Sequence, residues 1–185
     1  QTNVELEAFV HGALCVSYSG QCYMSEAITG RSANRGACAQ PCRSAYDLVD
    51  GTGNIILKNK HLLSLKDFNL SRSIRQLADA GICSFKIEGR LKNVDYVKNI
   101  TGLYMKELDA ILEERSEYRK ASSGKVFLGF TPDAQKSFNR GFTAYFTQKR
   151  EDSLTGFNTA KATGALVGTV TNVRKLCFEI DAKMP

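Results

Sequence analysis

The sequence lacks the signals that would assign it quickly to a class of enzyme. It has two histidines, His11 and His61, and contains neither an HExxH nor a GxSxG motif, so the usual signatures of zinc proteases and serine hydrolases are missing. No apolar run approaches the roughly 20 residues of a membrane span. No charged-then-apolar leader opens the chain, so secretion is not expected. We therefore expect a cytoplasmic protein without a membrane segment.

The bulk composition is that of an ordinary globular protein. Hydrophobic residues make up 43% and charged residues 24% of the 185 positions, which is enough chain for one domain and part of another. The formal charge of +6 permits a polyanionic partner such as RNA. The basic residues are scattered, however, so charge alone favours a solvated surface.

The most informative residues are the cysteines. Four of the six, Cys15, Cys22, Cys38 and Cys42, fall within 28 residues and are separated by six, fifteen and three residues. In a cytoplasmic protein such clustering favours a metal, an iron–sulfur cluster or redox chemistry over disulfides. Four thiolates suit an iron–sulfur cluster and also zinc. The alternative is four reduced thiols, some of them buried as small hydrophobic groups.

Two kinds of residue around these cysteines support a buried inorganic centre. Glycines let the backbone fold tightly, and positive side chains lower thiol pKa values and offset cluster charge. They are Gly12, Gly20, Gly30 and Gly36, and Arg31, Arg35 and Arg43. The spacing contains no short CxxC form, so it does not identify the metal.

The periodicity of the chain predicts an α/β fold. We expect a strand at 4–10, followed by an irregular segment at 13–43 with a short helix near 25–29. A hairpin of 45–49 with 54–58 comes next, and then a helix capped by Ser71 and ending at Gly81. A buried strand at 82–87 and a long helix capped by Asn93 complete this part. This order fits part of a parallel α/β sheet or TIM-type barrel.

The second part of the chain has a different character. Ser122-Ser123-Gly124 is typical of a linker, and residues 164–181 predict two strands of a small, barrel-like β region. We therefore expect one domain at 1–118, the later part of an α/β barrel, and a linker with the start of a β domain at 119–185.

A second candidate site is Lys86-Ile87-Glu88-Gly89-Arg90, where a strand ends and a helix soon begins. In α/β barrels this edge carries catalysis. Lys86 and Arg90 are candidates to orient an anionic substrate, and Glu88 is a candidate to transfer protons. The alternative is an ion-pair network that ties the strand to the helix. His11, at the end of the first strand, is a further candidate, although a structural histidine explains it as well.

Several separated blocks agree, in order, with a known family. They are Glu7-x-Phe9-x-x-Gly12-Ala13-Leu14-Cys15, Gly20-x-Cys22-x-Met24-Ser25, Arg31-Ser32-Ala33-Asn34-Arg35-Gly36, Cys38-Ala39-Gln40-Pro41-Cys42-Arg43, Ser64-Leu65-Lys66-Asp67 and Lys86-Ile87-Glu88-Gly89-Arg90. On these blocks, over roughly residues 4–115, the chain resembles peptidase family U32.

The resemblance implies two different activities. Some members of the family are named proteases, including collagenase-like ones, whereas others hydroxylate tRNA or ribosomal RNA, with prephenate implicated. Relatives that hydroxylate the ubiquinone ring carry a 4Fe–4S cluster. The resemblance implies cluster ligands at Cys15, Cys22, Cys38 and Cys42. Some relatives place a ligand where this chain has Asn69, so here all four cysteines are needed.

The residues favour cluster chemistry over hydrolysis. A Cys15–His11 pair is a conceivable nucleophile and base, but it leaves the other three clustered cysteines without a role. We therefore expect an iron–sulfur-dependent RNA hydroxylation enzyme whose upstream barrel half is missing from this chain. A collagenase-like peptidase is the alternative. A non-catalytic RNA-binding fragment, contacting phosphates through Lys161, Arg174 and Lys175, is the third possibility.

Overall fold

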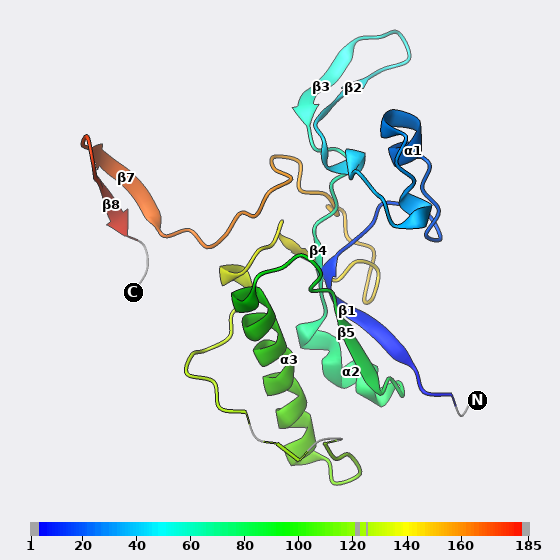
Figure 1. Cartoon of the computed structure of the whole chain (residues 1–185), viewed down its shortest axis with the longest axis vertical. Coiled ribbons are helices and arrows are strands. Elements are labelled where there is room, and N and C mark those ends of the chain that lie inside the picture. The colour runs from blue at the N-terminus through cyan, green and yellow to red at the C-terminus, as the bar shows by residue number, and fades with distance from the viewer. Residues whose placement is uncertain (1–3, 121–122, 125, 183–185) are drawn as a thin grey trace.

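The computed structural model describes residues 4–120, 123–124 and 126–182, and its centre is a four-stranded sheet (Figure 1). The strand order is β5-β1-β4-β6, with β1 at Glu7–Ala13, β4 at Asp67–Asn69, β5 at Ser84–Ile87 and β6 at Phe142–Thr143. β1 runs parallel to β5, and β4 runs parallel to β6. β1 and β4 are antiparallel.

The sheet is therefore mixed, whereas the sequence predicted a parallel one. The reason lies in the path of the chain. After β1 the chain leaves the sheet, forms the cysteine segment and a hairpin beyond its edge, and re-enters through β4 at that same edge (Figure 1). A strand that enters where its neighbour left must run antiparallel to it. The described residues form no closed barrel.

The long helix α3, at Val94–Glu114, forms the core with the sheet. As predicted, Asn93 caps it, because its side chain accepts a hydrogen bond from the Tyr96 amide at 2.9 Å. Its buried face meets β1 and the shorter helix α2, at Ile74–Asp79. The members of this core are Val10, Leu70, Ile74, Tyr96, Ile100, Tyr104, Ile111 and Ala134. Burial of this apolar stripe, rather than helix propensity alone, stabilises α3.

The beginning of α2 differs from the prediction. Ser71 opens a 3-10 turn, Ser71–Ser73, and the helix itself starts after Ser73 without a side-chain cap. The predicted end is correct, since Gly81 follows the helix with φ +89° and donates a backbone hydrogen bond to Ala78.

Two hairpins lie outside the sheet (Figure 1). The first, β2 (Tyr46–Val49) with β3 (Ile55–Lys60), is the predicted hairpin. The second, β7 (Gly168–Val173) with β8 (Phe178–Ala182), confirms the two predicted C-terminal strands and stands away from the sheet. The remaining elements are α1 (Met24–Thr29) and the 3-10 turns Ala33–Arg35, Pro41–Arg43 and Ala134–Lys136.

The segment before the second hairpin belongs to the sheet in space. β6 pairs with β4, and Leu65 forms an isolated bridge with Thr155. The linker predicted at 122–124 lies partly outside the described residues, so the division of the chain at 118 stays a prediction. None of the helices in the described part of the chain has the length and apolar character of a membrane-spanning segment.

Candidate functional site

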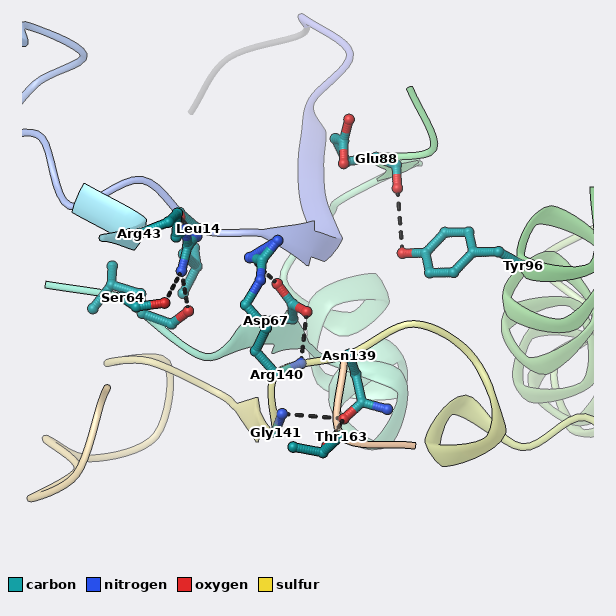
Figure 2. Close-up of polar contacts among 11 residues, drawn as sticks. Leu14, Arg43, Ser64, Asp67, Glu88, Tyr96, Asn139, Arg140, Gly141 and Thr163 are labelled. Atoms are coloured by element: carbon teal, nitrogen blue, oxygen red, sulfur yellow. Dashed lines mark hydrogen bonds and ion pairs between the residues drawn. The ribbon is translucent and has the colours of Figure 1, made fainter. Parts of the chain in front are cut away.

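The candidate site is one edge of the sheet, where four strands bring distant parts of the sequence together. β1 and β5 end at this edge, and β4 and β6 begin there. Glu88 follows β5, Asp67 opens β4 and Arg140 precedes β6 (Figure 2). The cysteine segment leaves from the end of β1. The carboxyl ends of parallel strands are where α/β proteins place ligands.

Glu88 is held against the end of β1. Its amide donates a hydrogen bond to the His11 carbonyl at 2.8 Å. A Cβ atom built on Gly12 would lie 2.5 Å from the Glu88 Cβ, and Gly12 has φ +133°. Glycine is required at this position both by the backbone conformation and by the close approach of Glu88.

A buried ion pair joins β4 to the segment before β6. Arg140 Nη1 donates to Asp67 Oδ1 at 3.0 Å, and the Arg140 backbone amide donates to Oδ2, also at 3.0 Å (Figure 2). The two side chains are only 8% and 6% exposed. Both carboxylate oxygens of Asp67 are thus occupied by one residue, which fixes Arg140 at the sheet edge.

A lysine and two aromatic rings lie beside this pair. Lys92 Nζ lies 3.5 Å from the centroid of the Phe138 ring and 5.4 Å from that of Tyr96. Burial lowers the pKa of Lys92, the negative charge of Asp67 raises it, and the positive charge of Arg140 lowers it. Burial, with the charges of Asp67 and Glu88, raises the pKa of Tyr96 to about 12. Tyr96 therefore stays protonated near neutral pH and donates to the Glu88 carbonyl at 3.4 Å.

Arg43 connects the cysteine segment to this edge. Its guanidinium donates to the Leu14 carbonyl at 2.8 Å, to Ser64 Oγ at 2.9 Å and to the Leu65 carbonyl (Figure 2). Burial lowers the pKa of Arg43, the charge of Arg140 lowers it further, and the thiolate of Cys42 raises it. The arginine next to Cys42 is thus close to both the cysteines and the ion pair.

A buried serine draws the two halves of the cysteine segment together. Ser25, in α1, is fully buried. Its Oγ donates to the Arg31 carbonyl at 2.6 Å and accepts from the Ala39 amide at 3.0 Å. Because Ala39 follows Cys38, and Ser25 lies shortly after Cys22, these bonds bring the two cysteine pairs into one neighbourhood.

The four clustered cysteines are free thiols, exposed at Cys15 and Cys38 and half-buried at Cys22 and Cys42, and the other three lie close enough to Cys42 to act on its charge. Burial raises the pKa of Cys42, the charge of Arg43 lowers it, and the thiolate charges of the other three cysteines raise it. Backbone amides also donate to two of the sulfurs, from Ser17 to Cys15 at 3.5 Å and from Gln40 to Cys38 at 3.2 Å. Such N–H···S bonds stabilise thiolates and are among the contacts that tune iron–sulfur clusters.

The chemistry of these thiols bears on which inorganic group they could hold. Across the described residues, no group of three or more His, Cys, Asp or Glu side chains is arranged to hold a single metal ion. Tetrahedral zinc needs its sulfurs about 3.8 Å apart, given Zn–S bonds of roughly 2.3 Å. A 4Fe–4S cluster places each thiolate on a different iron, so its ligand sulfurs lie farther apart. By its chemistry, the donor set of four free thiols suits a 4Fe–4S cluster and tetrahedral zinc alike.

His11 is part of the core. It is 1% exposed, and its Nδ1 lies 3.2 Å from the Tyr104 hydroxyl. That hydroxyl donates to the Val10 carbonyl at 2.8 Å and accepts from the Leu70 amide. Since its one proton is used, His11 must donate from Nδ1, which assigns the neutral tautomer. Burial lowers the pKa of His11 to about 4. The geometry is that of a structural histidine.

This burial predicts a pH-dependent stability. The folded pKa of about 4 is below the ordinary 6.5, so the unfolded chain binds the proton first. The stabilisation is present above pH 6.5 and is lost as pH falls toward 4, by roughly 3 kcal/mol in total. Urea unfolding across this range measures it. His11→Gln should remove this part of the slope, and an equal slope in both proteins would contradict the assignment.

The structure places the other predicted site residues in different surroundings. Lys86 pairs with Glu7 at 3.4 Å, with both side chains more than half exposed, and Arg90 is exposed. Neither is brought into the cluster around Asp67. Asn69, at the position where some relatives have a ligand, accepts from the Ser71 amide at 3.0 Å. Of the KIEGR block, Glu88 is the residue whose charge acts on Lys92 and Tyr96.

Sequence reasoning missed two members of this site, Lys92 and Arg140. Asp67 was noted as the end of the Ser64–Asp67 block, but nothing in the local pattern pairs it with Arg140, 73 residues later. The one usable signal is the Asn139-Arg140-Gly141 turn between aromatic residues, since a polar residue in an apolar stretch is often buried with a partner.

Comparison with known proteins identifies the family. The sequence model of the family described as "Peptidase family U32" matches residues 1–155. The chain therefore belongs to peptidase family U32. No solved structure matches it.

Relatives in this family carry two kinds of name. The chain is 51% identical to the "23S rRNA 5-hydroxycytidine C2501 synthase" of Escherichia coli, a match that covers 100% of this chain and 28% of that protein. It is 35% identical to "tRNA hydroxylation protein P1" of Bacillus subtilis, over 93% of this chain and 42% of the relative. It is 37% identical to a "Collagenase" of Porphyromonas gingivalis, over 75% and 37%. The chain thus spans less than half the length of these relatives.

Proposed function

We propose that this chain is the cluster-binding part of an enzyme that hydroxylates a pyrimidine base of RNA. The observation that carries the proposal is the gathering of four free thiols beside Arg43, next to the Asp67–Arg140 pair at the sheet edge. The names of the rRNA and tRNA hydroxylation relatives support the substrate class. We also propose that the chain forms the later part of an α/β barrel, although its described residues form no closed barrel by themselves.

Cys15, Cys22, Cys38 and Cys42 would hold a 4Fe–4S cluster. When bound, such a cluster supplies one-electron transfer. Replacing a ring C–H by C–OH is a two-electron oxidation that also needs an oxygen donor. The family resemblance implies prephenate, and none of the relatives' names mentions it, so that part stays a prediction.

The chain's own residues have defined tasks in this proposal. Glu88 lies beside a lysine and a protonated tyrosine, so its carboxylate is available to move a proton at the reacting base. Arg43 fixes the cysteine segment to the sheet edge through Leu14 and Leu65. An RNA base bound at this edge would therefore have Glu88, the proton-transfer group, on one side and the cysteines on the other.

The collagenase names of two relatives support peptidase activity as the second candidate. The contacts of the described residues weigh against a cysteine–histidine mechanism. His11 Nδ1 contacts Tyr104, and His61 Nδ1 contacts the Arg43 carbonyl at 2.9 Å. Cys15 instead contacts Ser17 Oγ at 3.0 Å. Neither histidine is placed as the base of a cysteine nucleophile.

Iron content is the first test. After anaerobic purification and reconstitution, we expect about four iron and four sulfide per chain with visible absorption of a cluster. Replacing Cys15, Cys22, Cys38 or Cys42 by serine, one at a time, should abolish or strongly reduce it. Cys83→Ser and Cys177→Ser are the matched controls, because both are exposed free cysteines outside the segment. An iron-free wild-type protein, or equal loss in the controls, would sink the cluster proposal.

Activity is tested on RNA from cells. In a strain that lacks the gene, the wild-type gene should restore a pyrimidine nucleoside heavier by one oxygen atom, detected by mass spectrometry. Glu88→Gln and Cys15→Ser should not restore it, whereas Lys98→Gln, an exposed change on α3, should. If purified protein instead cleaves gelatin, and Cys15→Ala abolishes the cleavage, the peptidase reading is correct.

A further inference from the structure

Arg140 has a buried hydrogen-bond donor without a partner. One edge of its guanidinium, at Nη1, contacts Asp67. Its Nε is buried and, among the described residues, has no hydrogen-bond partner. The side chain as a whole is only 8% exposed, so little water reaches it. Buried guanidinium groups normally use both edges of the fork. The Nε–Nη2 edge therefore has the geometry to take a second oxyanion.

The charged groups around this arginine differ in the bonds that they already make. Arg43, Lys92 and Arg140 are close enough to affect one another's pKa, against the two carboxylates Asp67 and Glu88. Both oxygens of Asp67 are bonded to Arg140, and Arg43 donates to neutral oxygens. Lys92 Nζ lies over aromatic rings. The thiolate charges of Cys42 and Cys15 also act on Arg43, so the groups left to attract an anion are Lys92 and the unpartnered Nε of Arg140.

A cavity lies beside these groups. Its volume is about 510 Å³, and its lining includes Lys92, Tyr96, Phe138 and Lys136 together with one carboxylate, that of Asp95. The positive end of the 21-residue helix α3 faces this region, because Asn93 is its N-cap and helix N-termini favour negative charge. Phe138 is 37% exposed and lies 5.1 Å from the Arg140 guanidinium. Arg140 is not itself in the cavity lining, and Phe138 is the lining residue that contacts it.

We infer that Lys92 and the Nε–Nη2 edge of Arg140 bind an oxyanion, with Phe138 as the side chain that covers the site. The oxyanion is a carboxylate of a small molecule or a phosphate of RNA, since both match a guanidinium fork and an ammonium group. Asp67 positions the fork from its other edge. The inference is independent of the cluster, because binding is measured without turnover.

The Nε–Hε resonance of Arg140 reports binding directly. In the ¹⁵N-labelled chain it is assigned by its disappearance in Arg140→Lys. Malonate, inorganic phosphate and a short single-stranded RNA are titrated separately, with chloride at matched ionic strength as the control. We expect a saturable shift with at least one probe. Lys92→Gln should weaken that binding about tenfold or more, while Lys98→Gln leaves it unchanged.

The three titrations separate the sources of the oxyanion. Saturation by malonate or phosphate assigns the site to a small molecule, and saturation by RNA alone assigns it to a backbone phosphate. Phe138→Ala should raise the association rate if the ring covers the site. The inference is overturned if no probe shifts the resonance beyond the chloride control, or if Lys92→Gln binds as well as wild type while thermal unfolding shows both proteins folded.

Discussion

Replacing Arg140 by methionine is expected to lower the free energy of unfolding by about 3–5 kcal/mol. The change removes the Nη1 hydrogen bond and the positive charge beside the buried Asp67 carboxylate, and leaves it only the backbone amide of residue 140. An uncompensated charge with 6% exposure has little water to replace them. Urea unfolding followed by circular dichroism measures the loss.

Two further variants separate burial from charge. Adding Asp67→Asn to Arg140→Met removes the stranded charge, so the double variant should be more stable than the single one. Arg75→Met breaks the exposed pair with Glu114, whose side chains are 42% and 60% exposed, and should cost no more than about 1 kcal/mol. If Arg140→Met costs no more than Arg75→Met, the ion pair does not hold the sheet edge together.

Gly12→Ala is the second large effect. We expect a loss of about 3 kcal/mol or more, since two costs combine at this position. The φ of +133° is unfavourable for alanine, and its Cβ would lie 2.5 Å from that of Glu88. Relief of the overlap would push Glu88 away from the site, so activity should fall even in molecules that remain folded.

Two other glycines make matched controls for this change. Gly36 has φ +80° with nothing within 4 Å of an added Cβ, so Gly36→Ala reports the conformational cost alone, about 1 kcal/mol. Gly51, in the turn of the first hairpin, has open space and no positive φ, so Gly51→Ala should be nearly neutral. Should Gly12→Ala match Gly36→Ala, the close approach of Glu88 contributes nothing.

The arrangement gives the cysteine segment a reason to lie where it does. It leaves the sheet at the end of β1, and Arg43 returns to that edge to bind Leu14 and Leu65. Its cysteines thereby come within electrostatic reach of the same arginine that Arg140 affects. A redox centre in the segment and a ligand at Arg140 would be neighbours, which is what electron transfer to a bound substrate requires.

Local features were predictable from the sequence because they depend on near neighbours. The long helix with its Asn93 cap and the Asp50–Gly53 hairpin turn follow from periodicity and turn chemistry. The short helix expected near 25–29 in the irregular segment is also present. The four clustered cysteines and the family blocks also stand in the sequence itself. A run of residues carries these signals without reference to the rest of the chain.

The tertiary structure alone decided which charged residues share the site. Lys86 and Arg90 seemed to belong with Glu88 because they are adjacent in sequence, yet Lys86 pairs with Glu7 on an exposed face. Arg140, 73 residues from Asp67, is its buried partner, and the antiparallel entry of β4 is what brings Asp67 to the edge. Strand direction and long-range pairing arise from how the whole chain packs. The sequence by itself therefore determined the family and the thiols, and the fold determined the anion-binding edge beside them.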